Sequence, residues 1–274
     1  MEFIKALSEH LFMQYAITAG LLASISCGIT GTFVVVKRIG FISGGIAHTA
    51  LGGLGVAFYF GINPMIGALI SAILAAIIIG LVTIKVDEHA DTVIGAMWAV
   101  GMAIGLIFMS ASPGYNTNLV TYLFGNILMV SRTDLIMLVT LNIMIFIIVI
   151  LLYRQFVLIS FDEVYSRLRG VRVNLVYILL LCMIALTVVL LIQVVGLILV
   201  IALLTLPAAI ARIYFDNMGK IMISAILLGM VFTISGLVFS FYGKNLPAGA
   251  TIIIVAGSVY LISVSIKNFT RKMY

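Results

Sequence analysis

Charged side chains are scarce in this sequence of 274 residues. Only 9% of the residues are Asp, Glu, Lys or Arg, whereas 64% are hydrophobic. A soluble domain carries roughly 25% charged residues and about 50% apolar ones, so this chain has too few charges to cover the surface of a water-soluble protein. Lipid requires no polar coat, and the composition therefore predicts an integral membrane protein.

Sequence motifs for common enzymes are absent as well. The chain has no GxxxxGKS or GxxxxGKT loop, no HExxH and no GxSxG, which excludes ATP hydrolysis through a P-loop and two common kinds of hydrolase site. Its two cysteines, Cys27 and Cys182, lie far apart in apolar runs, and we interpret both as small buried hydrophobes. Any energy for transport must then come from a partner or an ion gradient.

The net charge of +6 could suggest nucleic acid as a partner. The lysines and arginines lie instead in short breaks between apolar runs, where the positive-inside rule of membrane proteins places them. We therefore expect membrane lipid around the chain and no nucleic acid.

Uncharged runs long enough to cross a bilayer recur throughout the chain, since a spanning helix needs about 20 mostly apolar residues. The stretch 173–212 could form two crossings or one crossing and a broken helix, and we expect two. The stretch 119–130 is too short to cross and is typical of a re-entrant or interfacial piece. Residues 1–274 are thus expected to form one all-α, polytopic transmembrane bundle of eight or nine spans. The nine predicted spans are 11–36, 41–60, 64–84, 92–111, 134–153, 173–192, 195–212, 219–242 and 248–267.

The basic residues predict the orientation of this bundle. With the N-terminus outside and the C-terminus in the cytoplasm, twelve of the fifteen lysines and arginines fall on the inner side. Only Lys5, Arg132 and Lys244 remain outside.

The longest polar break, 154–172, is cytoplasmic in this topology. Its charged residues are spaced for a short helix, and Gly170 could end that helix as a left-handed cap. A helix that docks a soluble partner and an ordinary solvated loop are both compatible with this composition.

His48 is the one ionisable residue deep inside a predicted span. Such a residue is a functional candidate by default, because burying it in hydrocarbon is costly. Gly44, Gly52 and Gly55 share its helical face, with Gly45 and Thr49 beside it, and such small residues allow close helix packing or line a cavity. His48 could contact a metal ion or act as a gate; the alternative is a neutral histidine hydrogen-bonded across a helix contact.

Two weaker candidates remain. Pro207 can kink a helix and so line a pathway, although packing alone explains it equally well. A cluster of polar residues could hold a metal, although a solvated surface cluster is the simpler interpretation: Asp87, Glu88, His89 and Asp91. Asp91 also suits a helix N-cap.

Six segments, in this order, resemble the ABC-3 permease subunits of zinc- and manganese-type ABC importers, over essentially the whole chain. Each segment alone is a weak signal, whereas six in order are specific for the family and not for the metal. The segments are GFISGGIAHTALGGLGVAF (40–58), DTVIGAMWAVGMAIGLI (91–107), YLFGNIL (122–128), SFDEVYSRLRG (160–170), VVGLILVIALLTLPAAIAR (194–212) and NLPAGATIIIVAG (245–257).

The resemblance implies a type II-like importer with pseudo-symmetric halves. Two copies of this chain would assemble with two ABC ATPase subunits and an extracytoplasmic metal-binding protein, and ATP hydrolysis would belong to the ATPase subunit. No cofactor would be held stably. The cargo would be a divalent metal ion, zinc first and then manganese or iron. A secondary transporter and a purely structural membrane protein are the alternatives.

The resemblance also implies roles for individual residues. His48 would contact the metal, Gly44, Gly45, Thr49 and Gly52 would line its pathway, and segment 156–172 would couple to the ATPase. Its coupling residues would be Asp162, Glu163, Ser166 and Gly170. Two positions depart from the family pattern: Gly44 stands where an aspartate often precedes the histidine by one turn, and Ser166 stands where alanine is common.

Overall fold

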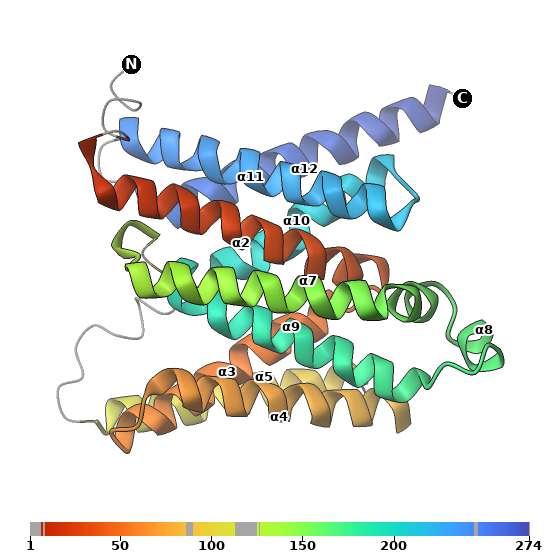
Figure 1. Cartoon of the computed structure of the whole chain (residues 1–274), viewed down its shortest axis with the longest axis horizontal. Helices are drawn as coiled ribbons and strands as arrows, with labels where there is room; N and C mark the ends of the chain where they lie inside the picture. The colour runs from red at the N-terminus through yellow and green to blue at the C-terminus, as the bar shows by residue number, and fades with distance from the viewer. Residues whose placement is uncertain are drawn as a thin grey trace.

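Nine helices in the described part of the chain are long and apolar enough to cross a membrane, as the sequence predicts (Figure 1). The structure is a computed structural model that describes residues 7, 9–85, 90–112, 125, 127–243 and 246–273. The nine helices are α2 (Leu11–Val36), α3 (Gly40–Tyr59), α4 (Pro64–Lys85), α5 (Ala90–Ser110), α7 (Arg132–Phe161), α9 (Val173–Val195), α10 (Leu197–Tyr214), α11 (Met218–Tyr242) and α12 (Ala248–Met273). Two short elements, the 3-10 helix η2 (Ile127–Met129) and α8 (Glu163–Leu168), complete the described part, which contains no strand.

Helix α7 is longer than the predicted span 134–153. Ser131 and Asp134 begin it with a capping box, in which each side chain accepts from the other residue's backbone N–H. The helix continues past Arg154, because this residue lies on the exposed face while Phe156 and Ile159 are buried on the opposite one. Charge on one face therefore did not end the helix, and the predicted boundary at residue 153 was wrong.

The stretch 173–212 forms two helices, as expected, and a single residue separates them. Gly196 has φ 82° and ψ 157°, a conformation that is open essentially to glycine alone. The backbone of Gly125 packs directly against Val195 and Gly196, so close that a Cβ at Gly125 would collide with them. Most of the predicted re-entrant piece 119–130 lies outside the described residues.

The helices pack as two interlocked groups (Figure 1). In one group, α3 packs on α4 and α5; in the other, α10 packs on α11 and α12. Helix α2, which precedes the first group in the chain, packs on α10 and α11 of the second group. Helix α9, which precedes the second group, packs on α3 and α4 of the first group. Helix α7 contacts both α2 and α9. These contacts are compatible with the pseudo-symmetric halves that the resemblance implies, which stay a prediction.

One end of the bundle gathers most of the described basic side chains. Alternation of the spans brings the ends of α2, α4, α7, α10 and α12 together there, with α8 projecting beyond them (Figure 1). Lys37, Lys85 and Arg212 lie at or next to the ends of α2, α4 and α10 there. Arg172 and Lys220 lie where α9 and α11 begin, whereas Arg132 begins α7 at the opposite end of the bundle. We call the end of the bundle that carries Lys37 the basic end.

Candidate functional site

His48 lies near the middle of α3 and is half-buried against α5. Its imidazole stacks on the Trp98 indole, with ring centroids 4.2 Å apart and ring planes 12° from parallel. The indole Nε1–H donates to the Met102 sulfur at 3.2 Å, which helps to fix the ring that His48 rests on. Sequence reasoning missed Trp98, although it is the one tryptophan of the chain and lies in a segment rich in small residues.

The Nδ1 atom of His48 is buried and has no hydrogen-bond partner in the described part of the chain. Buried polar atoms are nearly always hydrogen-bonded, and leaving one unsatisfied costs about 1–3 kcal/mol. A histidine kept for packing should find a partner across the helix contact. Nδ1 of His48 is therefore available to an external ligand; Oδ1 of Asn142 in α7 is likewise buried without a partner among the described residues.

Gly44, one turn before His48, is buried but has open space on the side where a Cβ would lie. A Cβ built on it would meet no atom within 4 Å. The position therefore has room for a side chain directed to the same region as the imidazole.

Gly45 and Gly52, in contrast, bring α3 against α5. A Cβ on Gly52 would lie 2.7 Å from the carbonyl oxygen of Gly101, and one on Gly45 would lie 2.5 Å from the Ile94 side chain. Thr49 donates to the carbonyls of Gly45 (2.8 Å) and, across the contact, Met97 (3.2 Å). These contacts give all three residues a packing role, and their assignment to a pathway stays a prediction.

An apolar depression of about 310 Å³ lies on the exposed side of this contact. Its rim and floor come from α3 and α5, and Thr49 is its one hydroxyl-bearing residue. The lining residues are Thr49, Ala96, Met97, Val100, Gly101 and Ile104. His48 itself does not line this depression, which lies beside its neighbour Thr49 and is almost entirely apolar.

No group of three or more metal-binding side chains occurs among the described residues. Asp87, Glu88 and His89 lie outside them, so their predicted cluster has no structural account here. Asp91 lies inside the first turn of α5 rather than at the cap, where its charge still complements the helix dipole. Pro207 is buried within α10, which accords with packing.

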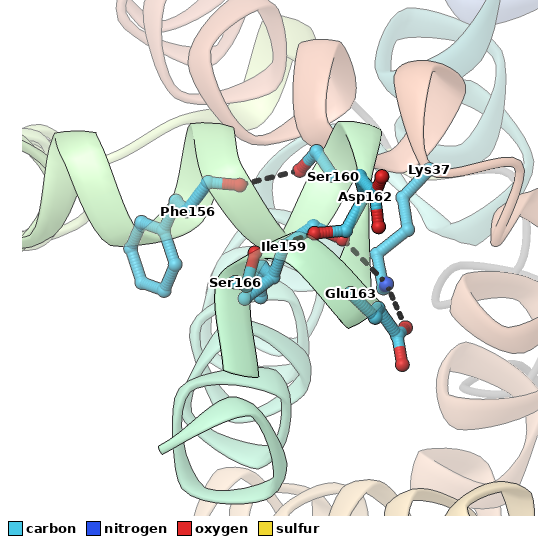
Figure 2. A network of polar contacts seen from close by, with 7 residues as sticks. All are labelled: Lys37, Phe156, Ile159, Ser160, Asp162, Glu163 and Ser166. Atoms are coloured by element: carbon cyan, nitrogen blue, oxygen red, sulfur yellow. Dashed lines mark hydrogen bonds and ion pairs between the residues drawn. The ribbon is translucent and has the colours of Figure 1, made fainter. Parts of the chain in front are cut away.

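The polar break forms the short helix that the charge spacing indicates. Asp162 caps α8 by accepting from the Tyr165 backbone N–H at 2.9 Å. The buried Ser166 hydroxyl donates to the Asp162 carbonyl at 2.6 Å (Figure 2). Gly170 has φ 77°, and the bonds Gly170 N–H to Arg167 and Val171 N–H to Ser166 complete a left-handed cap. The predicted cap at Gly170 is confirmed.

An exposed apolar face on this helix was missed. Within α8, Val164 and Leu168 are 71% and 82% exposed and lie one helical turn apart, with Tyr165 beside them. Phe161, the last residue of α7, is also 59% exposed, but the extended Asp162 separates it from α8. The i, i+4 pair of Val164 and Leu168 was visible in the sequence and suits a helix that docks into a groove. Asp162 and Ser166 therefore build α8, while its apolar face is free for a partner.

Comparisons with known proteins agree with this architecture. The model of the ABC 3 transport family matches residues 9–267. The chain belongs to this family. It is 47% identical to an uncharacterized membrane protein of Synechocystis, over 95% of this chain and 92% of that one. It is 33% identical to the manganese transport system membrane protein MntC of Listeria monocytogenes, over 96% and 93% of the two chains.

A solved structure shares the fold. PsaBC from Streptococcus pneumoniae, in complex with Fab, matches with a TM-score of 0.86 and 31% identity, over 96% of this chain and 94% of that one. The family assignment and the all-helical permease fold expected from the sequence are therefore confirmed, and the chain is a multi-pass membrane permease of the ABC transporter type.

Proposed function

We propose that this chain is the permease subunit of an ATP-driven importer for a divalent transition metal ion. One observation carries the proposal: a membrane-spanning helix of an ABC 3 family chain holds a histidine whose buried Nδ1 has no partner among the residues that the structure describes. Neutral imidazole is a good ligand for first-row metals. The metal is the cargo, and no resident cofactor is required.

Manganese is the first candidate for that cargo. Relatives that share about a third of their residues with this chain are named for manganese transport. An imidazole contact alone would favour zinc slightly, but selectivity can reside in the external binding protein. We therefore rank manganese above zinc and iron, which reverses the order expected from the sequence.

The basic end faces the cytoplasm in this proposal, with the N-terminus outside the cell membrane. The positive-inside rule supports this orientation. The α8 of each copy then projects toward one of two ATPase subunits. The apolar face of α8 supplies the docking surface. The opposite end receives an extracytoplasmic metal-binding protein.

Two copies of the chain enclose the pathway. The hollowed face of α3 and α5 is turned toward the second copy, so that both His48 side chains approach the common axis. Each histidine offers a weak, transient contact, since a conduit must release what it binds. A closed four-ligand site would hold the metal instead of passing it on.

The test is uptake by the whole transporter. The chain is purified with its ATPase subunit, reconstituted in proteoliposomes with the binding protein, and supplied with Mn²⁺ or Zn²⁺. We expect ATP-dependent uptake, faster for Mn²⁺. Uptake that persists without the ATPase would establish a secondary transporter, and no uptake of any divalent metal would overturn the proposal.

A further inference from the structure

Basic side chains at the basic end cap the last turns of neighbouring helices. Lys267 of α12 donates to the Ile213 carbonyl of α10 at 2.8 Å, and Arg212 of α10 donates to Val35 of α2 at 3.4 Å. Lys37, directly after α2, donates to the Ile159 carbonyl of α7 at 2.9 Å. Carbonyls in a last helical turn lack intrahelical partners and carry partial negative charge, so a cation there is stabilising. These caps tie successive helices in the order α12, α10, α2 and α7.

Lys37 has partners beyond the carbonyl that it caps. Its Nζ forms an ion pair with the Glu163 carboxylate at 2.5 Å, at the first residue of α8 (Figure 2). The same Nζ lies 4.9 Å from the centroid of the Tyr177 ring in α9. One ammonium thus holds the end of α7, the start of α8 and the side of α9.

Burial makes this arrangement sensitive to movement. The Lys37 side chain is only 10% exposed, so its charge depends on the carboxylate, the carbonyl and the ring for compensation. Glu163 is 46% exposed and could be solvated alone. A displacement of α8 that pulled Glu163 away would therefore draw Lys37 with it, or leave a buried cation poorly compensated.

The chain position of Lys37 links this network to the metal site. Arg38 follows it with φ 60°, a left-handed conformation rare for a non-glycine residue, and α3 begins at Gly40. His48 lies eight residues further along the same helix, about 12 Å at 1.5 Å per residue. A short, sharply bent connection thus joins the α8 network to the helix that carries His48.

We propose that Lys37 is a positioning residue that transmits movement of α8 to α3 and so couples ATP hydrolysis to access at His48. This inference rests on the proposed function, because it requires an ATPase that moves α8. It adds a residue outside segment 156–172 to the coupling machinery.

The test measures metal ions transported per ATP hydrolysed in the reconstituted whole transporter. Lys37→Met removes the charge, keeps a long side chain and leaves only the half-exposed Glu163 without its partner. We expect the complex to assemble and hydrolyse ATP, while metal transported per ATP falls by about fivefold or more, the lower limit of typical coupling between sites. Lys37→Arg should retain most of the coupling.

Lys220→Met is the matched control. Lys220 lies exposed at the same end, and its side chain makes no hydrogen bond or ion pair within the described part of the chain. We expect wild-type metal transport per ATP from this variant, which separates loss of the Lys37 contacts from loss of a positive charge.

Glu163→Gln provides a second, independent break of the same pair. It should also lower metal transport per ATP, and the double variant with Lys37→Met should be no worse than Lys37→Met alone, since both changes remove one interaction. Unchanged coupling in an assembled Lys37→Met or Glu163→Gln transporter would overturn the inference, and so would loss of assembly in both. Absence of ATP-driven uptake in the wild type would instead overturn the proposed function.

Discussion

The two parts of the molecule that matter for transport differ in how well their polar groups are satisfied. At the basic end, Lys37 has a carboxylate, a carbonyl and an aromatic ring as partners, and Asp162 and Ser166 are hydrogen-bonded within α8. In the middle of α3, His48 has a stacked ring but a buried Nδ1 without a partner in the described ranges. The neighbouring Gly44 is buried but has open space where a Cβ would lie.

This contrast corresponds to two tasks. A segment that transmits force must keep its geometry, and multiple bonds to one buried charge provide that. A segment that passes a metal ion must leave coordination positions open. A site with few ligands then binds the transported ion only transiently. Contacts between α3 and α5 then have to hold the open site in shape.

The largest effect is expected where α3 touches α5. Gly52→Val would push a side chain into the Gly101 carbonyl, which lies 2.7 Å from an ideal Cβ. We expect a loss of about 3 kcal/mol, which lowers the thermal midpoint of the purified chain by roughly 6–12 °C. Gly44→Ala is the control and should change the midpoint by less than about 2 °C, because its Cβ meets nothing. Equal effects of the two changes would refute the assigned contact.

A smaller effect should follow from filling the space beside His48. Gly44→Asp places a carboxylate one turn from the imidazole, in a position with room for it. We expect Mn²⁺ or Zn²⁺ to bind about tenfold more tightly by calorimetry, in the range of changes seen when groups that support metal ligands are altered. Gly44→Asn has nearly the same size without the charge and should bind as the wild type does. Unchanged affinity in Gly44→Asp would place the metal elsewhere.

An effect of similar size concerns the end of α8. Gly170→Ala puts a side chain into open space, so the cost comes from the left-handed backbone alone, about 1–2 kcal/mol. Amide hydrogen exchange in α8 should accelerate by about tenfold for each 1.4 kcal/mol, and recovery of the ATPase subunit on purification should fall. Gly170→Asn should show a weaker change, since asparagine tolerates this conformation. Wild-type exchange in Gly170→Ala would mean that the cap does not stabilise α8.

Much of the fold could be predicted from the sequence, because a helix that crosses the hydrocarbon core of a bilayer needs about 20 mostly apolar residues. All nine spans, the division of 173–212 into two helices and the cap at Gly170 depended on local patterns that a single chain displays, although the division lies at Gly196 and not near Gln193 as predicted. The end of α7 was missed, because exposed Arg154 and Gln155 resemble a loop when only composition is considered.

The candidate site was less predictable. His48 stood out as an ionisable residue in an apolar run, but its stacking on Trp98 depends on which helices meet. The ion pair between Lys37 and Glu163 joins residues 126 positions apart, and no periodicity reveals such a contact. Pairings of this kind arise from tertiary packing, which the pattern of a single helix does not contain.

Metal uptake by a His48→Ala transporter tests the central claim most directly. The variant, the wild type and a His10→Ala control, whose histidine precedes α2 and is exposed, are assembled with the ATPase and binding protein in proteoliposomes. We predict that ATP-driven uptake falls by about tenfold or more in His48→Ala alone, with ATPase assembly retained. Uptake at the wild-type rate in the assembled His48→Ala transporter would contradict the account.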